Sequence, residues 1–154
     1  MAKKFQFSLK KVLDYRKNIE DEKAVELKKQ KSELRQRQQK LTHIRNKKMN
    51  FLDGEKEQAE GRTRPYSYLI SFGYKTQLNK RIDNKEEEVK KSKSKVQKRR
   101  SKLIKASKKR KILENLEEQR FEEYKEEYNQ EEKKRLDEIA IRRASNEINE
   151  GLIQ

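Results

Sequence analysis

Few side chains in this sequence could carry out chemistry. The only histidine, His43, lies in a basic and polar stretch with no acidic residue three or four positions further on, and the chain contains no cysteine. We expect such a histidine to face solvent instead of acting as a metal ligand or general base. The carboxylates at helical spacing are expected to be solvated charges and not metal ligands; they are Glu122, Glu123, Glu126 and Glu127. Because a glycine-rich phosphate loop is also missing, the sequence predicts a protein that is not an enzyme and uses no cofactor or metal.

The composition excludes a thick globular core. Charged residues make up 45% of the chain and hydrophobic residues 30%, and the formal net charge is +16. Such values approach those of disordered proteins, but breaker residues are scarce and good helix formers such as Lys, Glu, Gln, Arg and Leu dominate. The apolar residues therefore suffice for a narrow stripe between helices. We expect an all-α protein, with disorder as the competing class.

Breaker residues are concentrated in one part of the chain. Three of the four glycines and the only proline fall between Gly54 and Gly73. Since glycine and proline end helices, the sequence predicts a helix over about residues 7–53, a turn over about 54–65 and a longer helix over about 66–149. We interpret residues 1–154 as a single coiled-coil domain, an antiparallel helical hairpin of rod shape whose second helix overhangs the first.

Apolar residues recur at steps of seven in both predicted helices, as in a seam that is buried against a partner helix. The first helix carries such a row at Leu13, Leu27, Leu34 and Leu41, interrupted by Glu20, with Ile44 and Phe51 in a neighbouring row. The second carries it at Ile82, Val89, Val96 and Leu103, flanked by Leu78, Ala106 and Leu113. Polar residues occupy the complementary positions, namely Lys31, Gln38, Lys85, Ser92 and Arg99. The hairpin is therefore expected to be marginally stable.

A turn centred near Thr63 fixes a simple register, in which residue i lies opposite residue 126 − i. It places Phe5 and Phe7 beside Phe121 and Tyr124, in an aromatic cluster at the free end that also takes in Leu9 and Leu116. Beyond about Phe121 the second helix has no partner in the chain. Its apolar residues there suggest that another protein covers it, or else it is a solvated tail; they are Tyr124, Tyr128, Leu136, Ile139 and Ile148.

Charge is segregated along the predicted helices. Residues 90–111 carry thirteen Lys or Arg and no acid, whereas residues 112–138 carry eleven acids against five bases. Residues 28–48 add nine bases against Glu33. This basic belt could attract an acidic partner or could simply be a solvated face, and like charges across the hairpin cost some stability.

Two segments near the ends of the chain carry a family resemblance. Residues 111–143, KILENLEEQRFEEYKEEYNQEEKKRLDEIAIRR, resemble the carboxy-terminal signature of the FliJ family of flagellar export proteins, through Leu113, Leu116, Tyr124, Asp137, Glu138, Ala140 and Arg143. Residues 5–27 resemble the opening pattern of the family, through Phe5, Leu9, Val12, Leu13, Arg16, Glu22 and Ala24. Tyr74, Leu78 and Ile82 are similar to its entry into the second helix.

The resemblance implies a stalk and coupling protein of the flagellar type III export apparatus. Members resemble the central stalk of rotary ATPases, an antiparallel coiled coil inserted in a ring of six subunits. The implied partners are the hexameric flagellar export ATPase, the cytoplasmic part of the export-gate membrane protein and empty export chaperones. The implied place is cytoplasmic, at the inner face of the cell membrane at the flagellar base, with membrane contact only through partners.

The resemblance also suggests which residues meet these partners. We expect the free end to seat in the ATPase ring, through Phe5, Leu9, Phe121, Tyr124, Tyr128, Asp137, Glu138 and Arg143. We expect the part near the turn to face the gate and the chaperones, through Leu41, Ile44, Phe51, Tyr74 and Leu78. Among these five, the leucines are also natural seam residues.

Two other functions stay open at this point. One is the equivalent stalk of a virulence-type secretion system. The other is a nucleic-acid-binding coiled coil, suggested by the net charge of +16 and the run KKRK at residues 108–111. We expect no nucleic-acid partner, because no aromatic stacking platform or recognisable reader motif accompanies the basic residues.

Overall fold

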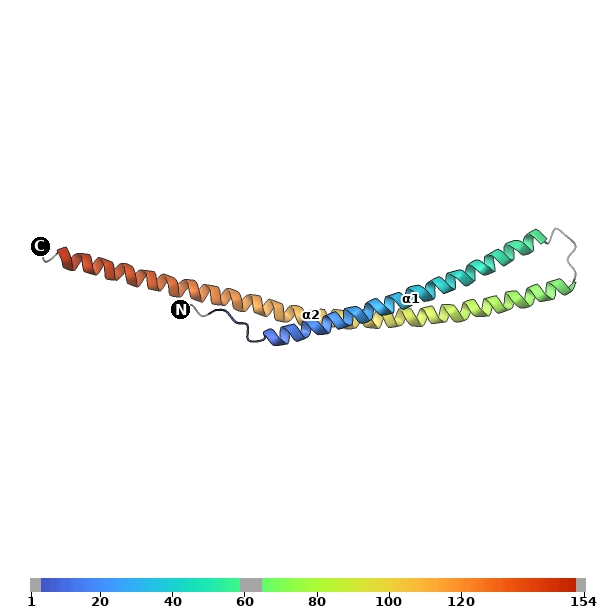
Figure 1. The fold of residues 1–154 in the computed structure, drawn as a ribbon, viewed down its shortest axis with the longest axis horizontal. Helices are drawn as coiled ribbons and strands as arrows, with labels where there is room; N and C mark the ends of the chain where they lie inside the picture. The colour runs from blue at the N-terminus through green and yellow to red at the C-terminus, as the bar shows by residue number, and fades with distance from the viewer. Residues whose placement is uncertain (1–3, 59–64, 152–154) are drawn as a thin grey trace. The chain divides into compact units, whose positions relative to one another are not determined.

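The structure, a computed structural model, describes residues 4–58 and 65–151, with side chains described for residues 4–57 and 65–147. It contains two helices, α1 (Lys10–Gln58) and α2 (Pro65–Gly151), and no strand within those ranges (Figure 1). The two helices pack against each other, and α2 is the longer, with 87 residues against 49. The predicted all-α fold, a two-helix hairpin with a longer second helix, is confirmed.

The helix ends differ from those expected. α1 begins at Lys10 instead of residue 7 and continues through Gly54 to Gln58, and α2 begins at Pro65. The predicted turn was therefore wrong at residues 54–58, while residues 59–64 lie outside the described part. A glycine inside a helix costs only about 0.5–1 kcal/mol relative to alanine, which the helix formers after Gly54 can offset. Pro65 suits the first position of α2, where a backbone N–H has no helical acceptor.

The chain divides into two compact units, each built from parts of both helices. Unit 1 comprises Met1–Lys17 and Lys108–Gln154, and unit 2 comprises Asn18–Ser107. Whether residues 1–154 behave as one domain stays a prediction. The units are described separately below.

Unit 2 is held by a thin apolar seam between the helices. Leu41, Ile82 and Val89 form its buried cluster, and Leu34 and Ile44 pack against it. Leu27, Leu78 and Ala106 are also buried. The rows at steps of seven thus face the partner helix as predicted, and each fully buried Leu, Val or Ile contributes roughly 1.5–3 kcal/mol.

Ion pairs across unit 2 report the register of the hairpin. The predicted register, in which residue i lies opposite residue 126 − i, places Glu26 opposite Arg100 and Arg37 opposite Val89. The observed partners are Arg99, which donates to Glu26 Oε2 at 2.5 Å, and Glu88, whose Oε2 lies 3.9 Å from Arg37 Nη1. Near the turn, the Phe51 and Tyr74 rings meet, where the rule expects residue 75. The predicted register is therefore correct to within about one residue at these three places, whereas Arg45 pairs with Glu86, five residues from the expected Arg81.

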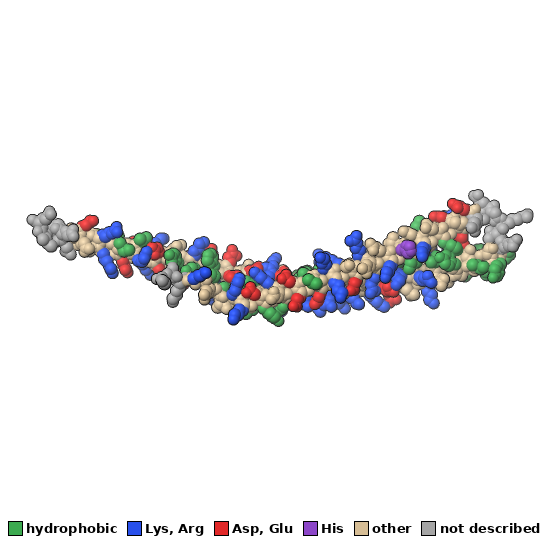
Figure 2. All heavy atoms as spheres, viewed as in Figure 1, with side chains coloured by type: hydrophobic (Ala, Val, Ile, Leu, Met, Phe, Trp, Pro, Cys, Tyr) green, Lys and Arg blue, Asp and Glu red, His purple; other side chains and the backbone are tan. Residues whose placement is uncertain are grey.

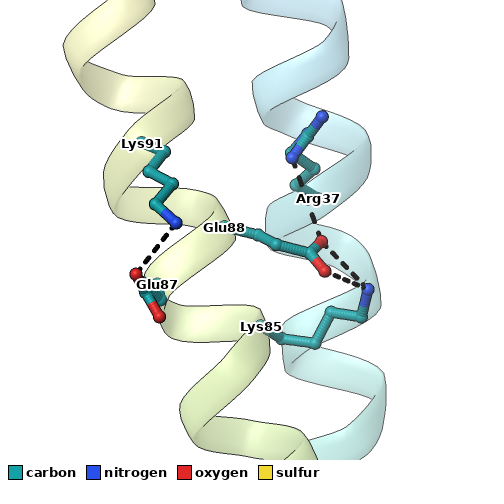
Figure 3. A network of polar contacts seen from close by, with 5 residues as sticks. All are labelled: Arg37, Lys85, Glu87, Glu88 and Lys91. Carbon is teal, nitrogen blue, oxygen red and sulfur yellow. Dashed lines mark hydrogen bonds and ion pairs between the residues drawn. The ribbon is translucent and has the colours of Figure 1, made fainter.

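Polar residues of the seam behave in two ways. Ser92 is buried, with 3% of its surface exposed, whereas Lys31 and Gln38 are exposed. Lys85 is half-buried and its Nζ donates to both carboxylate oxygens of Glu88 at 2.9 Å. Figure 3 shows the Glu88 side chain extending from α2 toward Arg37 of α1. Carboxylates between basic side chains thus replace apolar contacts along part of the seam.

Unit 1 contains the most deeply buried side chain of the described residues, Leu13, which has 0% exposure. Two cross-helix ion pairs flank it: Lys10 Nζ lies 3.6 Å from Glu117 Oε1, and Lys17 Nζ lies 3.7 Å from Glu114 Oε1. These pairs are partly exposed, so each contributes about 0–1 kcal/mol. Leu13 is therefore the main anchor of α1 against α2 in this unit.

Over the residues that the structure describes, neither helix has a stretch that is both long enough and apolar enough to cross a membrane.

Candidate functional site

The residues considered first for chemistry are dispersed and solvated. His43 is exposed and lines a shallow depression together with Gln36, Gln39 and Lys85. The acidic group at residues 122–127 is exposed, and its members Glu122 and Glu123 pair with Lys125 and Arg120. Among the described residues, no three histidines or carboxylates gather closely enough to hold a metal ion. The candidate sites that remain are binding surfaces.

An aromatic cluster forms in unit 1, where residues ahead of α1 meet α2. The Phe5 ring lies edge-on to the Phe121 ring, with centroids 5.3 Å apart, and its centroid is 5.6 Å from that of Tyr124. Tyr124 in turn stacks on Tyr128 at 6.3 Å. Such pairs contribute about 0.5–1.5 kcal/mol beyond their buried area. The register brings Phe5 to Phe121 and Tyr124 as expected.

A cavity of about 340 Å³ lies beside this cluster. It is lined by residues from both segments, namely Phe5, Gln6, Phe7, Ser8, Leu9, Leu116, Arg120, Glu123, Tyr124 and Glu127. Phe7, Leu9 and Leu116 thus line the same cavity as Phe5 and Tyr124. Sequence reasoning missed the Lys125 ammonium, whose Nζ is 5.8 Å from the centroid of the Phe121 ring, close enough for a cation–π contact.

The apolar face of the cluster continues along α2. Phe121 and Ile139 are eighteen residues, about five turns, apart, so they lie on the same face of the helix. Tyr128 and Leu136 fall within about a quarter turn of that line. These side chains are exposed, from 39% for Ile139 to 55% for Leu136. We call Tyr128, Leu136 and Ile139 the tail stripe; it extends the face that Phe5 covers at Phe121.

The other expected contacts of the free end are also open to solvent. Asp137, Glu138 and Arg143 are exposed, as is every described side chain from residue 133 to residue 147. The side chain of Ile148 lies outside the described residues. We call residues 128–147 the tail; its side chains are exposed in the described part of unit 1, apart from that of Glu132, which is half-buried.

The residues expected to face the gate and the chaperones divide into two kinds. Leu41 and Leu78 are buried at 6% and 3% exposure, and Ile44 packs against the buried cluster. Phe51 and Tyr74 contact each other edge-on, with ring centroids 4.8 Å apart, and Tyr74 keeps 41% of its surface exposed. The leucines position the helices, and the aromatic pair is the part that another protein could reach.

One exposed apolar surface was missed by the sequence analysis. Tyr66, Tyr68, Leu69, Ile70 and Phe72, in the first turns of α2, are all between 58% and 74% exposed. A signal was present in the sequence, because residues 65–74 read PYSYLISFGY and are rich in apolar side chains. Periodicity alone assigns such residues to a seam, and here they lie outside it.

The electrostatics of unit 2 are dominated by its basic belt. A hydrogen bond from Lys23, assisted by the charge of Arg99, lowers the pKa of Glu26 below its usual value. Hydrogen bonds from Lys85 and Lys91 likewise lower the pKa values of Glu88 and Glu87 (Figure 3). These three carboxylates are ionised at neutral pH and partly neutralise the belt, whose remaining lysines and arginines are visible along the surface in Figure 2.

The fold and these surfaces define a two-helix coiled-coil protein with exposed apolar faces on α2. The family model for the flagellar FliJ protein matches residues 5–149 of this chain. The chain therefore belongs to the FliJ family, a non-catalytic component of flagellar export, and has a role related to that export. Comparison with curated proteins and with solved structures gives no significant match.

Proposed function

We propose that this protein is a non-enzymatic stalk that couples the flagellar export ATPase to the export gate. The observation that carries the proposal is the tail stripe. It continues the face on which Phe5 packs against Phe121, yet Tyr128, Leu136 and Ile139 are exposed. A helix with an exposed apolar face is typical of a segment that another protein covers.

The occupant of this surface is the hexameric ATPase ring. The aromatic cluster with Phe5, Leu9, Phe121 and Tyr124 forms one part of the surface that contacts the ring, and Tyr128 extends this surface along α2. Asp137, Glu138 and Arg143 add exposed charges on the tail that can pair with charges of the ring. Apolar anchors in the centre of an interface with charges around them supply affinity and orientation respectively.

The part of unit 2 near the turn faces the export gate and the empty chaperones. The Phe51–Tyr74 pair offers a partly exposed aromatic edge, with Ile44 beside the buried cluster. Leu41 and Leu78 contribute indirectly, because they hold the two helices at the spacing that presents this edge. Through these partners the protein is placed in the cytoplasm, at the inner face of the membrane at the flagellar base.

The experiment that tests the proposal is reconstitution with the export ATPase. We expect the purified chain to co-elute with the ATPase, to promote its hexamer and to raise its rate of ATP hydrolysis. A matched pair of variants locates the contact: Leu136→Ser with Ile139→Ser should abolish stimulation, and Val25→Ser with Ile104→Ser, which are exposed elsewhere, should not. Stimulation that survives the first pair and is lost in the second would overturn the assignment.

The basic belt favours one alternative, a nucleic-acid-binding coiled coil. In that case the protein should bind duplex DNA or RNA with an affinity that falls steeply with the logarithm of salt concentration. Replacing Lys108, Lys109 and Lys111 with Gln would then reduce that slope. An equivalent stalk in a virulence-type secretion system would instead stimulate the ATPase of that system and not the flagellar one.

A further inference from the structure

The first turns of α2 expose a concentration of apolar and aromatic side chains that the proposed stalk contacts do not use. We call Tyr66, Tyr68, Leu69, Ile70 and Phe72 the start patch; each keeps more than half of its surface exposed, up to 74% at Tyr66. Figure 2 shows hydrophobic side chains gathered there, at the start of α2. Soluble proteins rarely leave contiguous apolar surface uncovered without a binding role.

The start patch points away from α1. Leu78 is buried at 3% exposure and marks the side of α2 that faces α1, and Ser71, about two turns earlier on the same side, is half-buried. Leu69 lies nine residues before Leu78, about two and a half turns, and so projects from the opposite side. Serine therefore occupies the inward position and apolar side chains the outward ones, the reverse of what helix pairing requires.

The start patch is also too broad for a second coiled-coil seam. Successive residues of a helix are rotated by roughly 100° around its axis. Seen down the axis, the start patch covers an arc of about 200°, in the order Tyr68, Phe72, Leu69, Tyr66 and Ile70. A seam of a and d positions occupies a much narrower stripe. A broad, convex apolar arc of about two turns fits a flat apolar medium, such as the boundary between lipid headgroups and acyl chains.

Charge around the patch fits an anionic lipid surface. Residues 65–82 contain no acid, and Lys75, Lys80 and Arg81 follow the patch with exposed side chains. The acids near the end of α1, Asp53, Glu55 and Glu57, belong to the helix from which the patch points away. Tyrosine has an apolar ring with a polar tip, and such side chains are enriched at membrane interfaces.

The same charges disfavour a second copy of this chain as the occupant. Two patches placed together would bring their own lysines and arginines close to each other without any acid from this segment to pair with them. We propose that the start patch inserts into the headgroup region of an anionic bilayer, with Lys75, Lys80 and Arg81 on lipid phosphates. This contact is independent of the proposed contact with the ATPase, because it involves neither the tail nor the aromatic cluster; it lies beside the Phe51–Tyr74 pair that is proposed to face the gate.

Vesicle flotation of the full chain tests this proposal. We expect the protein to float with vesicles of equal parts phosphatidylcholine and phosphatidylglycerol, and much less with phosphatidylcholine alone. Leu69→Ser with Phe72→Ser leaves the net charge unchanged and should lower binding at least about tenfold. Ile104→Ser with Ile112→Ser, which changes two side chains that are 49% and 66% exposed elsewhere on α2, should leave it unchanged. Equal binding by both double variants would mean that the basic belt alone holds lipid and would overturn the proposal.

Insertion can also be observed at single positions, because the chain contains no tryptophan. A Phe72→Trp variant should show a blue shift of its fluorescence and quenching by brominated lipids when these anionic vesicles are added. An Ile104→Trp variant should show neither change. An unaffected Trp at position 72 would contradict insertion. Concentration-dependent dimerisation that is abolished by Leu69→Ser with Phe72→Ser would assign the patch to self-association instead.

Discussion

Unit 2 and the tail of unit 1 use the same kinds of residue in opposite ways. In unit 2, Leu41, Ile82 and Val89 bury their side chains between two helices. In the tail, Leu136 and Ile139 are part of a helix and stay exposed. The difference shows that apolar residues in this protein are not all placed to support its own fold.

Local ion pairs help to keep α2 helical, both just before the tail and in its first turns. Lys125 Nζ lies 3.3 Å from Glu122 Oε1, and Arg135 Nη2 lies 2.9 Å from Glu132 Oε1. Such pairs three residues apart contribute only about 0.2–0.5 kcal/mol each. The tail therefore depends on helix propensity more than on packing, and its exposed stripe is free to bind a partner.

The largest loss of stability should come from removing a buried side chain from the apolar seam of unit 2. Leu41→Ala removes a side chain with 6% exposure and should lower the free energy of unfolding by about 2–4 kcal/mol. The matched change in the tail, Ile139→Ala, should change it by less than about 0.5 kcal/mol. Urea unfolding followed by circular dichroism gives both values. Equal losses would show that the tail is packed in solution and would remove the contrast between the two regions.

A smaller effect should follow when the aromatic cluster at the base of the tail is removed. Phe121→Ala with Tyr124→Ala eliminates the contacts of both rings with Phe5, so the free energy of unfolding should fall by about 1–3 kcal/mol. Phe72→Ala is the control, because that ring is 60% exposed and should cost almost nothing. If the double variant unfolds at the same urea concentration as the unchanged protein, residues 4–9 do not hold α2.

Acidification should weaken unit 2 by the smallest amount. The pKa values of Glu26, Glu87 and Glu88 are lowered in the folded protein. Their contribution is therefore complete above the pKa of an unfolded glutamate and is lost as the pH falls through the lower folded values. We expect constant stability from pH 7 to about pH 5 and a decline below that.

The same titration can be repeated with Glu88→Gln, which removes the ion pair with Arg37. That variant should lose less stability on acidification than the unchanged protein, and added salt should reduce the difference because these groups are solvent-accessible. A stability that rises as the pH falls from 5 to 3 would contradict the role given to these carboxylates.

Much of the hairpin could be predicted from the sequence, because a repeat of seven and one group of breakers together determine which residues face each other. That is why Arg99 beside Glu26, Glu88 beside Arg37 and Phe121 beside Phe5 lie within about one residue of the expected places. The ion-pair partners of Lys17 and Arg45 lie five residues from theirs. The end of α1 was misplaced, since Gly54 was treated as a stop. No side chain or backbone crowds Gly54, so the helix passes through it at a small cost.

The binding surfaces were less predictable. Phe5, Phe121 and Tyr124 could be grouped because the register alone brings them together. Leu41 and Leu78 were assigned to partners although they are buried between the helices. The start patch was missed because periodicity identifies an apolar face but not the side on which a partner lies. Which protein or lipid covers an exposed face depends on molecules outside the chain.

The central claim is that the tail serves a partner and not the fold, and one truncation tests it most directly. Removing the residues from Leu136 onward should leave the urea midpoint of the paired helices unchanged and reduce helix content only by the residues removed. The same protein should no longer stimulate the export ATPase. Full stimulation by the truncated protein would contradict the claim, and so would a loss of helix content that extends into unit 2.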